Sequence, residues 1–156
     1  MPLDGSKLAE EALPMAADLA TTLSSRIHLV RTYDPMTSLA GGAAALAEAG
    51  TTASQLIEEQ DRIERDECES YLSASARGLA EEGLDVESVT LRATPVDGLK
   101  SVIEGLADVI VVMTSRGRGG LQRFVLGSVA DGLLHSVEVP IMVIPSLAQT
   151  RSTGQR

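Results

Sequence analysis

The sequence predicts a single α/β domain in which helices cover both faces of a parallel sheet. Segments with helical and strand-like patterns alternate along the chain, and strands joined by helices form right-handed crossovers in a mostly parallel sheet. A chain of 156 residues has the length of one domain with one core of ordinary size. Aromatic residues are almost absent, so this core must be built from Val, Ile, Leu, Ala and Met.

The first half of the chain predicts two helices on either side of a strand. Apolar residues take up helical spacing after Gly5, with Ser6 as the cap, and Pro14 is expected to bend this helix. Gly83 is expected to end the second helix. The expected segments are a helix from Ser6 through Leu23, a strand over residues 26–33, a mobile Gly/Ala-rich connection over residues 36–50, and a charged helix over residues 54–82.

The second half predicts three strands and two helices. Ser128 is expected to cap the last helix. Before the Asp4–Gly5 turn only Met1, Pro2 and Leu3 are left to form a first strand, which usually takes about five residues. The expected segments are strands over residues 86–93, 109–113 and 139–144, helices over residues 96–106 and 128–136, one domain over residues 1–146, and a disordered polar tail over residues 147–156.

Composition disfavours several classes of partner. The net charge of −9 disfavours DNA, RNA and anionic lipid surfaces, and the scarcity of aromatic residues disfavours single-stranded nucleic acid. Cys68 is the only cysteine, which excludes a disulfide scaffold and favours a reducing cytoplasm. The sequence shows neither a membrane-spanning apolar run nor a signal peptide, and neither histidine has a partner at metal-ligand spacing.

A glycine-rich loop follows the strand over residues 109–113 and precedes the last helix. Gly117, Gly127 and Ser128 in this loop can offer backbone N–H groups and a helix N-terminus to a phosphate. The loop is neither a Walker A loop nor a dinucleotide fingerprint. Its arginines are either phosphate contacts or solvated loop charges, and these are Arg116, Arg118 and Arg123.

Two motifs at opposite ends of the chain carry a resemblance to a known family. The Pro2-Leu3-Asp4-Gly5-Ser6 turn, and Gly117 separated by nine residues from Gly127-Ser128, resemble the universal stress protein family. They are closest to its ATP-binding branch, whose signature is Gly-x2-Gly-x9-Gly-Ser/Thr. The resemblance implies a Rossmann-like, open, twisted sheet of five parallel strands in the order 3-2-1-4-5.

The resemblance also implies which residues contact a nucleotide. The ribose and adenine are expected near Pro2 and Asp4, with a backbone contact to adenine near Thr32. Met113 lines the nucleotide at the end of the fourth strand. The phosphates are expected at the glycine loop and the following helix, with Mg²⁺ as an optional companion ion. The implied set is Pro2, Asp4, Thr32, Met113, Thr114, Gly117, Gly127, Ser128 and Val129.

The chain departs from the family pattern in two places. Thr114 stands where the signature has its first glycine, so its side chain either crowds the nucleotide or bonds to it. The family also has about four more strand residues before Pro2. We therefore expect either a truncated first strand, with a start upstream of Met1, or a fold that tolerates a minimal strand.

The resemblance leads to a functional hypothesis and to alternatives. The first is a cytoplasmic, ATP-binding stress-response protein that dimerises through its last strand, Val139 to Ile144, with no catalytic residue assigned and at most slow hydrolysis. The second is a nucleotide-free dimeric signalling module, which Thr114 and the short first strand favour. The third, an adenylating enzyme of the ATP-pyrophosphatase type, is disfavoured because the Asp4-Gly5-Ser6-Lys7 turn does not match its loop.

Overall fold

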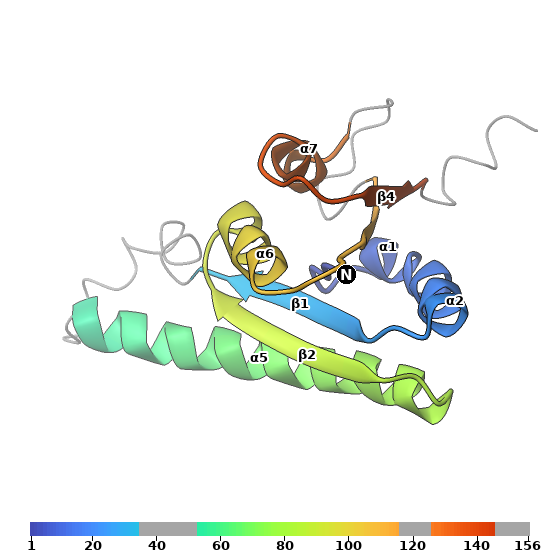
Figure 1. Ribbon diagram of the computed structural model, residues 1–156. Helices are drawn as coiled ribbons and strands as arrows, with labels where there is room; N and C mark the ends of the chain where they lie inside the picture. The colour runs from blue at the N-terminus through green and yellow to red at the C-terminus, as the bar shows by residue number, and fades with distance from the viewer. Residues whose placement is uncertain (35–52, 116–125, 146–156) are drawn as a thin grey trace, which may run out of the picture.

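The computed structural model describes residues 1–34, 53–115 and 126–145, and the centre of the fold is two pairs of parallel strands (Figure 1). Strand β1 (Ile27–Tyr33) pairs with β2 (Val86–Arg92), and β3 (Val111–Thr114) pairs with β4 (Ile141–Ile144). The helices are α1 (Lys7–Glu10), α2 (Leu13–Leu23), α5 (Ala53–Glu81), α6 (Pro95–Glu104) and α7 (Ser128–Leu134). The alternating α/β order predicted from the sequence is confirmed.

Met1–Leu3 lies beside β1 but forms no full strand. Pro2 forms an isolated parallel bridge with Val30. The Leu3 amide donates to the Val30 carbonyl at 2.9 Å, and the Val30 amide donates to the Met1 carbonyl at 2.9 Å. Within the described residues, no hydrogen bond joins this segment to β3. The structure therefore shows two separate two-stranded sheets, and the continuous five-stranded order is not confirmed.

Helices cover both faces of the β1–β2 pair. Helix α5 packs along one face, where Leu29 of β1 meets Leu72 and Leu79 in one core cluster (Figure 1). Helix α6 packs on the other face, where Leu99 meets Val30. The same second cluster continues to β3 and α7, so the two sheets share a core although no strand bridges them. Apart from Tyr33 and Cys68, the buried apolar residues are Ala, Val, Leu, Ile and Met, as the composition predicts.

Local sequence signals account for the starts of α1 and α2, but the start of α7 differs from the prediction. Ser6 caps α1 by accepting a hydrogen bond from the Ala9 amide at 3.1 Å, as predicted. The expected bend near Pro14 is a full break, because α1 ends at Glu10 and Pro14 lies in the first turn of α2. The prediction that Ser128 caps the last helix is wrong. Gly127 takes the cap position in an extended conformation, so Ser128 is already helical and Gly127 provides no capping side chain.

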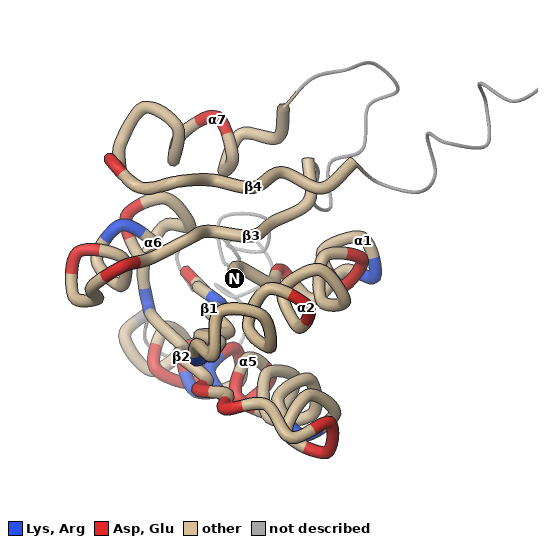
Figure 2. The backbone as a smooth tube through the Cα atoms, turned by 45° about the vertical axis from the view of Figure 1, so that its right-hand side comes forward, with Lys and Arg blue, Asp and Glu red and all other residues tan. Residues whose placement is uncertain are grey.

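Charge is distributed unevenly over these elements. Figure 2 shows acidic residues along α5 and on α1 and α6, whereas β3 and β4 carry no charge. Most charges on α5 face away from the sheet because the helix must bury its thin apolar stripe. None of the helices in the described part of the chain combines the length and apolar character needed to cross a bilayer.

Candidate functional site

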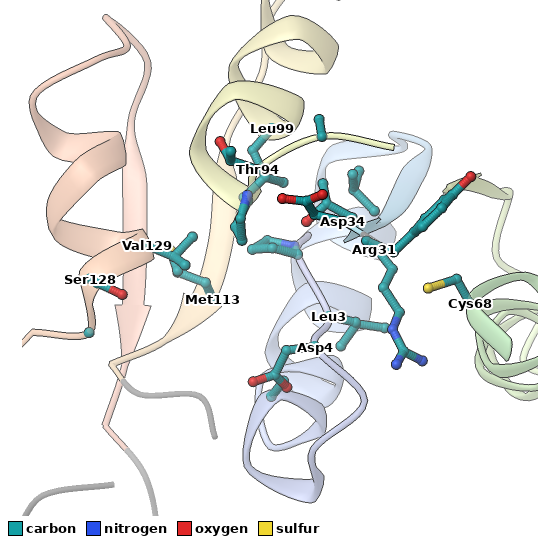
Figure 3. Close-up of a pocket in the computed structure, with 18 of the residues that line it drawn as sticks. Leu3, Asp4, Arg31, Asp34, Cys68, Thr94, Leu99, Met113, Ser128 and Val129 are labelled. Atoms are coloured by element: carbon teal, nitrogen blue, oxygen red, sulfur yellow. The ribbon is translucent and has the colours of Figure 1, made fainter. Parts of the chain in front are cut away.

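A cavity of about 920 Å³ opens where the strands end (Figure 3). Its walls come from the Asp4 turn, the ends of β1 and β3, the loop before α6, one face of α5 and the start of α7. Because the strands are parallel, their carboxyl ends lie on the same side of the molecule. Ligands of open α/β sheets bind at this edge, in the crevice where the strand order reverses. This cavity is therefore the candidate site.

All but one of the predicted contact residues line this cavity. Gly117 lies outside the described residues, as do Arg116, Arg118 and Arg123. The fold thus brings residues from both ends of the chain together, although their roles in binding remain predictions. The predicted residues found in the cavity wall are Pro2, Asp4, Thr32, Met113, Thr114, Gly127, Ser128 and Val129.

A tight turn fixes the Asp4 carboxylate at the cavity. Its Oδ1 atom accepts hydrogen bonds from the Ser6 amide at 2.9 Å and from the Ser6 hydroxyl at 2.6 Å. Gly5 makes this turn possible with a φ of +81°, in the left-handed region that other residues rarely adopt. A carboxylate held in this way accepts hydrogen bonds from hydroxyl groups, as a sugar ring would require.

The edge of β1 that faces the cavity presents free backbone groups at Thr32. The amide of Ile27 donates to Asp85, and the Tyr33 carbonyl accepts from Ala93, so the odd-numbered residues of β1 bond to β2. The N–H and C=O groups of Thr32 therefore point to the edge of β1 that does not pair with β2. On this edge, Thr32 lies two residues past Val30, which accepts the hydrogen bond from Leu3. Within the described residues, no backbone group bonds to Thr32 on that edge. One donor beside one acceptor matches the hydrogen-bonding edge of a base.

The far end of the cavity is the start of α7. Gly127 donates its amide to the Ser115 carbonyl at 2.8 Å, so this amide is engaged within the protein. The amides of the first turn of α7 have no helical acceptor, as at every helix start. Ser128 is exposed here, whereas Met113 and Thr114 are buried beside it at the end of β3. The Thr114 side chain thus occupies the cavity wall where the family signature has a glycine.

Several residues of the cavity wall were missed by sequence reasoning. Asp34 directly follows β1, and Thr94 directly precedes α6. Figure 3 shows Asp34 facing the cavity between Thr94 and Arg31. Their position at strand ends is a signal that could have found them. Cys68, interpreted from the sequence as a small residue in a charged helix, is buried and also lines the cavity. No sequence signal identifies it, because the face of α5 that meets the cavity is set by packing.

The charge of the described wall is acidic. Four carboxylates line the cavity and one guanidinium, that of Arg31, opposes them. The carboxylates belong to Asp4, Asp34, Glu64 and Glu67. In the described part of the chain, no three His, Cys, Asp or Glu side chains are grouped to hold a metal ion by themselves.

The fold and the cavity define a Rossmann-like α/β domain with a ligand crevice at the carboxyl ends of its parallel strands. Residues 1–145 match the model of the Universal stress protein family, and the chain belongs to that family. A curated relative, universal stress protein Sll1388 of Synechocystis, is 27% identical over 91% of this chain and 93% of its own length.

Two solved structures share the fold. The hypothetical protein MJ0577 superposes with a TM-score of 0.77 at 19% identity, covering 92% of each chain. A universal stress protein in complex with cAMP superposes with a TM-score of 0.56 at 16% identity, covering 94% of each chain. At these levels of identity the two structures show a common fold, and the ligand of the present chain must be argued from its own residues.

Proposed function

We propose that this protein is an ATP-binding universal stress protein that acts as a nucleotide-dependent regulator with at most slow hydrolysis. The observation that carries the proposal is the meeting of the Asp4 turn, the free edge of β1 at Thr32 and the start of α7 around one cavity. The cAMP complex of a protein with the same fold supports a nucleotide as the class of ligand.

The chemistry of each wall suggests how ATP is oriented. The Thr32 edge has the donor and acceptor for adenine, and the Asp4 carboxylate accepts from ribose hydroxyls. The phosphates then extend toward Gly127, Ser128 and Val129, where first-turn amides lie at the cavity. The loop sequence over residues 114–127 contains no Asp, Glu or His that could act as a general base beside the phosphates, which favours slow hydrolysis over rapid turnover.

The acidic wall favours ATP bound with a cation. A triphosphate carries several negative charges and would be repelled by Asp4, Asp34, Glu64 and Glu67, and among the described residues of the wall only Arg31 opposes them. Mg²⁺ on the phosphates reduces this repulsion, so we propose the Mg²⁺ complex as the bound form. Chelating Mg²⁺ should then weaken ATP binding much more than adenosine binding, whereas equal weakening would contradict this reasoning.

The finer points of the fold belong to the same proposal. We propose that the two sheets join into the order 3-2-1-4-5 through a strand that contains Met1–Leu3, and that the protein is a cytoplasmic homodimer. Strand β4 supports the dimer because β3 covers one of its edges and no described strand covers the other. An apolar, uncharged edge strand favours pairing with a second copy.

The decisive test is calorimetric titration with Mg²⁺-ATP, with and without the substitution Gly127→Val. Gly127 has a φ of −61°, which valine adopts without strain, so the variant should fold and carry its new side chain at the cavity wall. We expect it to lose ATP binding. The matched control is Gly78→Val on α5, where an added Cβ meets nothing within 4 Å. No binding to the unaltered chain at millimolar ATP would overturn the proposal.

A nucleotide-free dimeric module is the second candidate. The buried Thr114 side chain at the cavity favours it, because the family signature has a glycine there. Under this alternative the unaltered chain dimerises but binds no nucleotide, and Gly127→Val leaves its interactions intact. Thr114→Gly would restore ATP binding if the Thr114 side chain were the obstacle.

A further inference from the structure

Arg31 lies against the turn that carries Asp4. It leaves β1 on the face that packs against α5. A Cβ atom built on Gly5 would lie 3.0 Å from Nη2, 3.1 Å from Cζ and 3.2 Å from Nη1 of Arg31. Because these distances are nearly equal, the flat face of the guanidinium must be turned toward the Gly5 backbone. The guanidinium therefore packs against the turn at Gly5. A residue with a Cβ atom at this position would force the guanidinium to move away.

Tyr71 of α5 holds this guanidinium in place. The Cζ atom of Arg31 lies 4.9 Å from the centroid of the Tyr71 ring, within the range of a cation–π contact. The Tyr71 hydroxyl donates to the Glu10 carboxylate of α1 at 2.9 Å. Tyr71 and Glu10, which hold Arg31, do not line the cavity, whereas the Arg31 side chain does (Figure 3).

The Asp4 turn consequently has two supports. Ser6 holds the carboxylate through two hydrogen bonds, and Arg31 supports the backbone at Gly5. We propose that Arg31 is a positioning residue that sets the direction in which the Asp4 carboxylate meets a ribose. This role rests on the proposed function, since it deepens the account of how the nucleotide is recognised.

Removal of the planar group should release the turn. Asp4 and Gly5 would then sample several orientations, and a hydrogen bond from a sugar hydroxyl to the carboxylate would form in only some of them. Hydrogen bonds to charged acceptors are worth about tenfold in affinity or somewhat more. Loss of the Arg31 platform should therefore weaken binding of a ribose ligand by about tenfold and spare a ligand that lacks the hydroxyls.

The test compares Mg²⁺-ATP with Mg²⁺-2′,3′-dideoxy-ATP by titration calorimetry. The unaltered chain should prefer ATP by about tenfold or more. Arg31→Lys keeps the positive charge of the wall but lacks the flat face, so it should bind ATP about tenfold more weakly and dideoxy-ATP within about twofold of the unaltered chain. Arg31→Ala also removes the charge, so it should weaken both triphosphates and weaken ATP about tenfold more than dideoxy-ATP. The control is Arg26→Ala, which removes exposed ion pairs to Asp85 and Glu87 at the other end of β1 and should change neither affinity.

A double-mutant cycle and a ligand-free measurement complete the test. Asp4→Asn alone should reduce the preference for ATP over dideoxy-ATP as much as Arg31→Ala does. The double variant should reduce this preference no more than either single variant. In Arg31→Ala without ligand, the Ser6 amide should exchange its hydrogen faster than in the unaltered chain. Equal weakening of both ligands, additive losses or unchanged exchange would overturn the role of Arg31 alone. Absence of ATP binding to the unaltered chain would overturn the proposed function and this role together.

Discussion

Residues added before Met1 should stabilise the fold, because a polypeptide that begins at Met1 places its amino group in the interior. This group donates to the His28 carbonyl at 2.6 Å and lies at a second cavity of about 470 Å³ between β1 and β3. Burial lowers the pKa of the Met1 amino group from its ordinary 8.0 to about 5. The folded state therefore disfavours the charged amine.

The magnitude and sign follow from the two pKa values of this amino group. Between pH 5 and pH 8 the unfolded chain binds a proton that the folded chain excludes, so stability rises with pH across this window. The difference of about three units corresponds to a penalty of about 4 kcal/mol below pH 5. The penalty is roughly 1–2 kcal/mol at pH 7 and vanishes above pH 8.

The assay is urea denaturation from pH 5 to pH 8.5 on three polypeptides whose first residues are verified by mass. One begins at Met1, one carries Gly-Ser-Gly-Ser before Met1, and one carries Val-Ile-Val-Ile. Both extensions convert the amine to an amide and should remove the pH-dependent penalty. Only the apolar extension can fill the cavity and pair with the edges of β1 and β3, at His28 and Val112, so it should gain a further few kcal/mol.

Two outcomes would refute this reasoning. If the polypeptide that begins at Met1 shows the same pH dependence as the Gly-Ser polypeptide, its amino group is not buried in the folded state. If the apolar extension is no more stable than the Gly-Ser extension at every pH, the cavity between β1 and β3 does not accept a strand. The second result would also count against the proposed order 3-2-1-4-5.

Three further predictions concern packing and ionisation. Leu72→Ala should cost about 2–5 kcal/mol in urea unfolding, because this fully buried side chain joins α5 to β1. Gly132→Ala should cost about 1–3 kcal/mol, since the added Cβ would lie 2.7 Å from Val96 Cγ2, and adding Val96→Ala should recover part of the loss. Burial and the hydrogen bond to Glu10 raise the pKa of Tyr71 to about 12. The midpoint pH of its ultraviolet titration should therefore fall in Glu10→Gln. The contribution of Tyr71 to stability should be lost as the pH rises from 10 through 12.

The local features of the fold were predictable because they depend on neighbouring residues. The serine before α1 and the left-handed glycine after α5 act over a few residues, and the structure has both, whereas Pro14 was expected to bend one helix and instead lies in the first turn of a second. The sheet order was not settled in this way. It depends on whether Met1–Leu3 pairs with β3 as well as β1, which is a non-local contact made by only three residues.

The residues of the candidate site also fall into those that the sequence indicated and those that only the structure shows. The family resemblance implied Asp4, Thr32 and Met113, and all three lie at the ends of extended segments, which the rule for parallel sheets brings together. Arg31 and Cys68 could not be found in this way. Arg31 reaches the cavity because a glycine in a distant turn leaves room for it, and Cys68 because α5 packs along β1. Packing of this kind is visible only in three dimensions.

Both cavities border the segment Met1–Leu3. Pro2, Val30 and Leu99 line the larger cavity at the carboxyl ends of the strands and the smaller cavity at their amino ends. The segment bridges to β1, and the described strands form two separate sheets. A longer strand before Met1 would fill the smaller cavity and leave the larger one open, because the chain turns away at Gly5. The larger cavity therefore follows from the turn at Asp4 and Gly5.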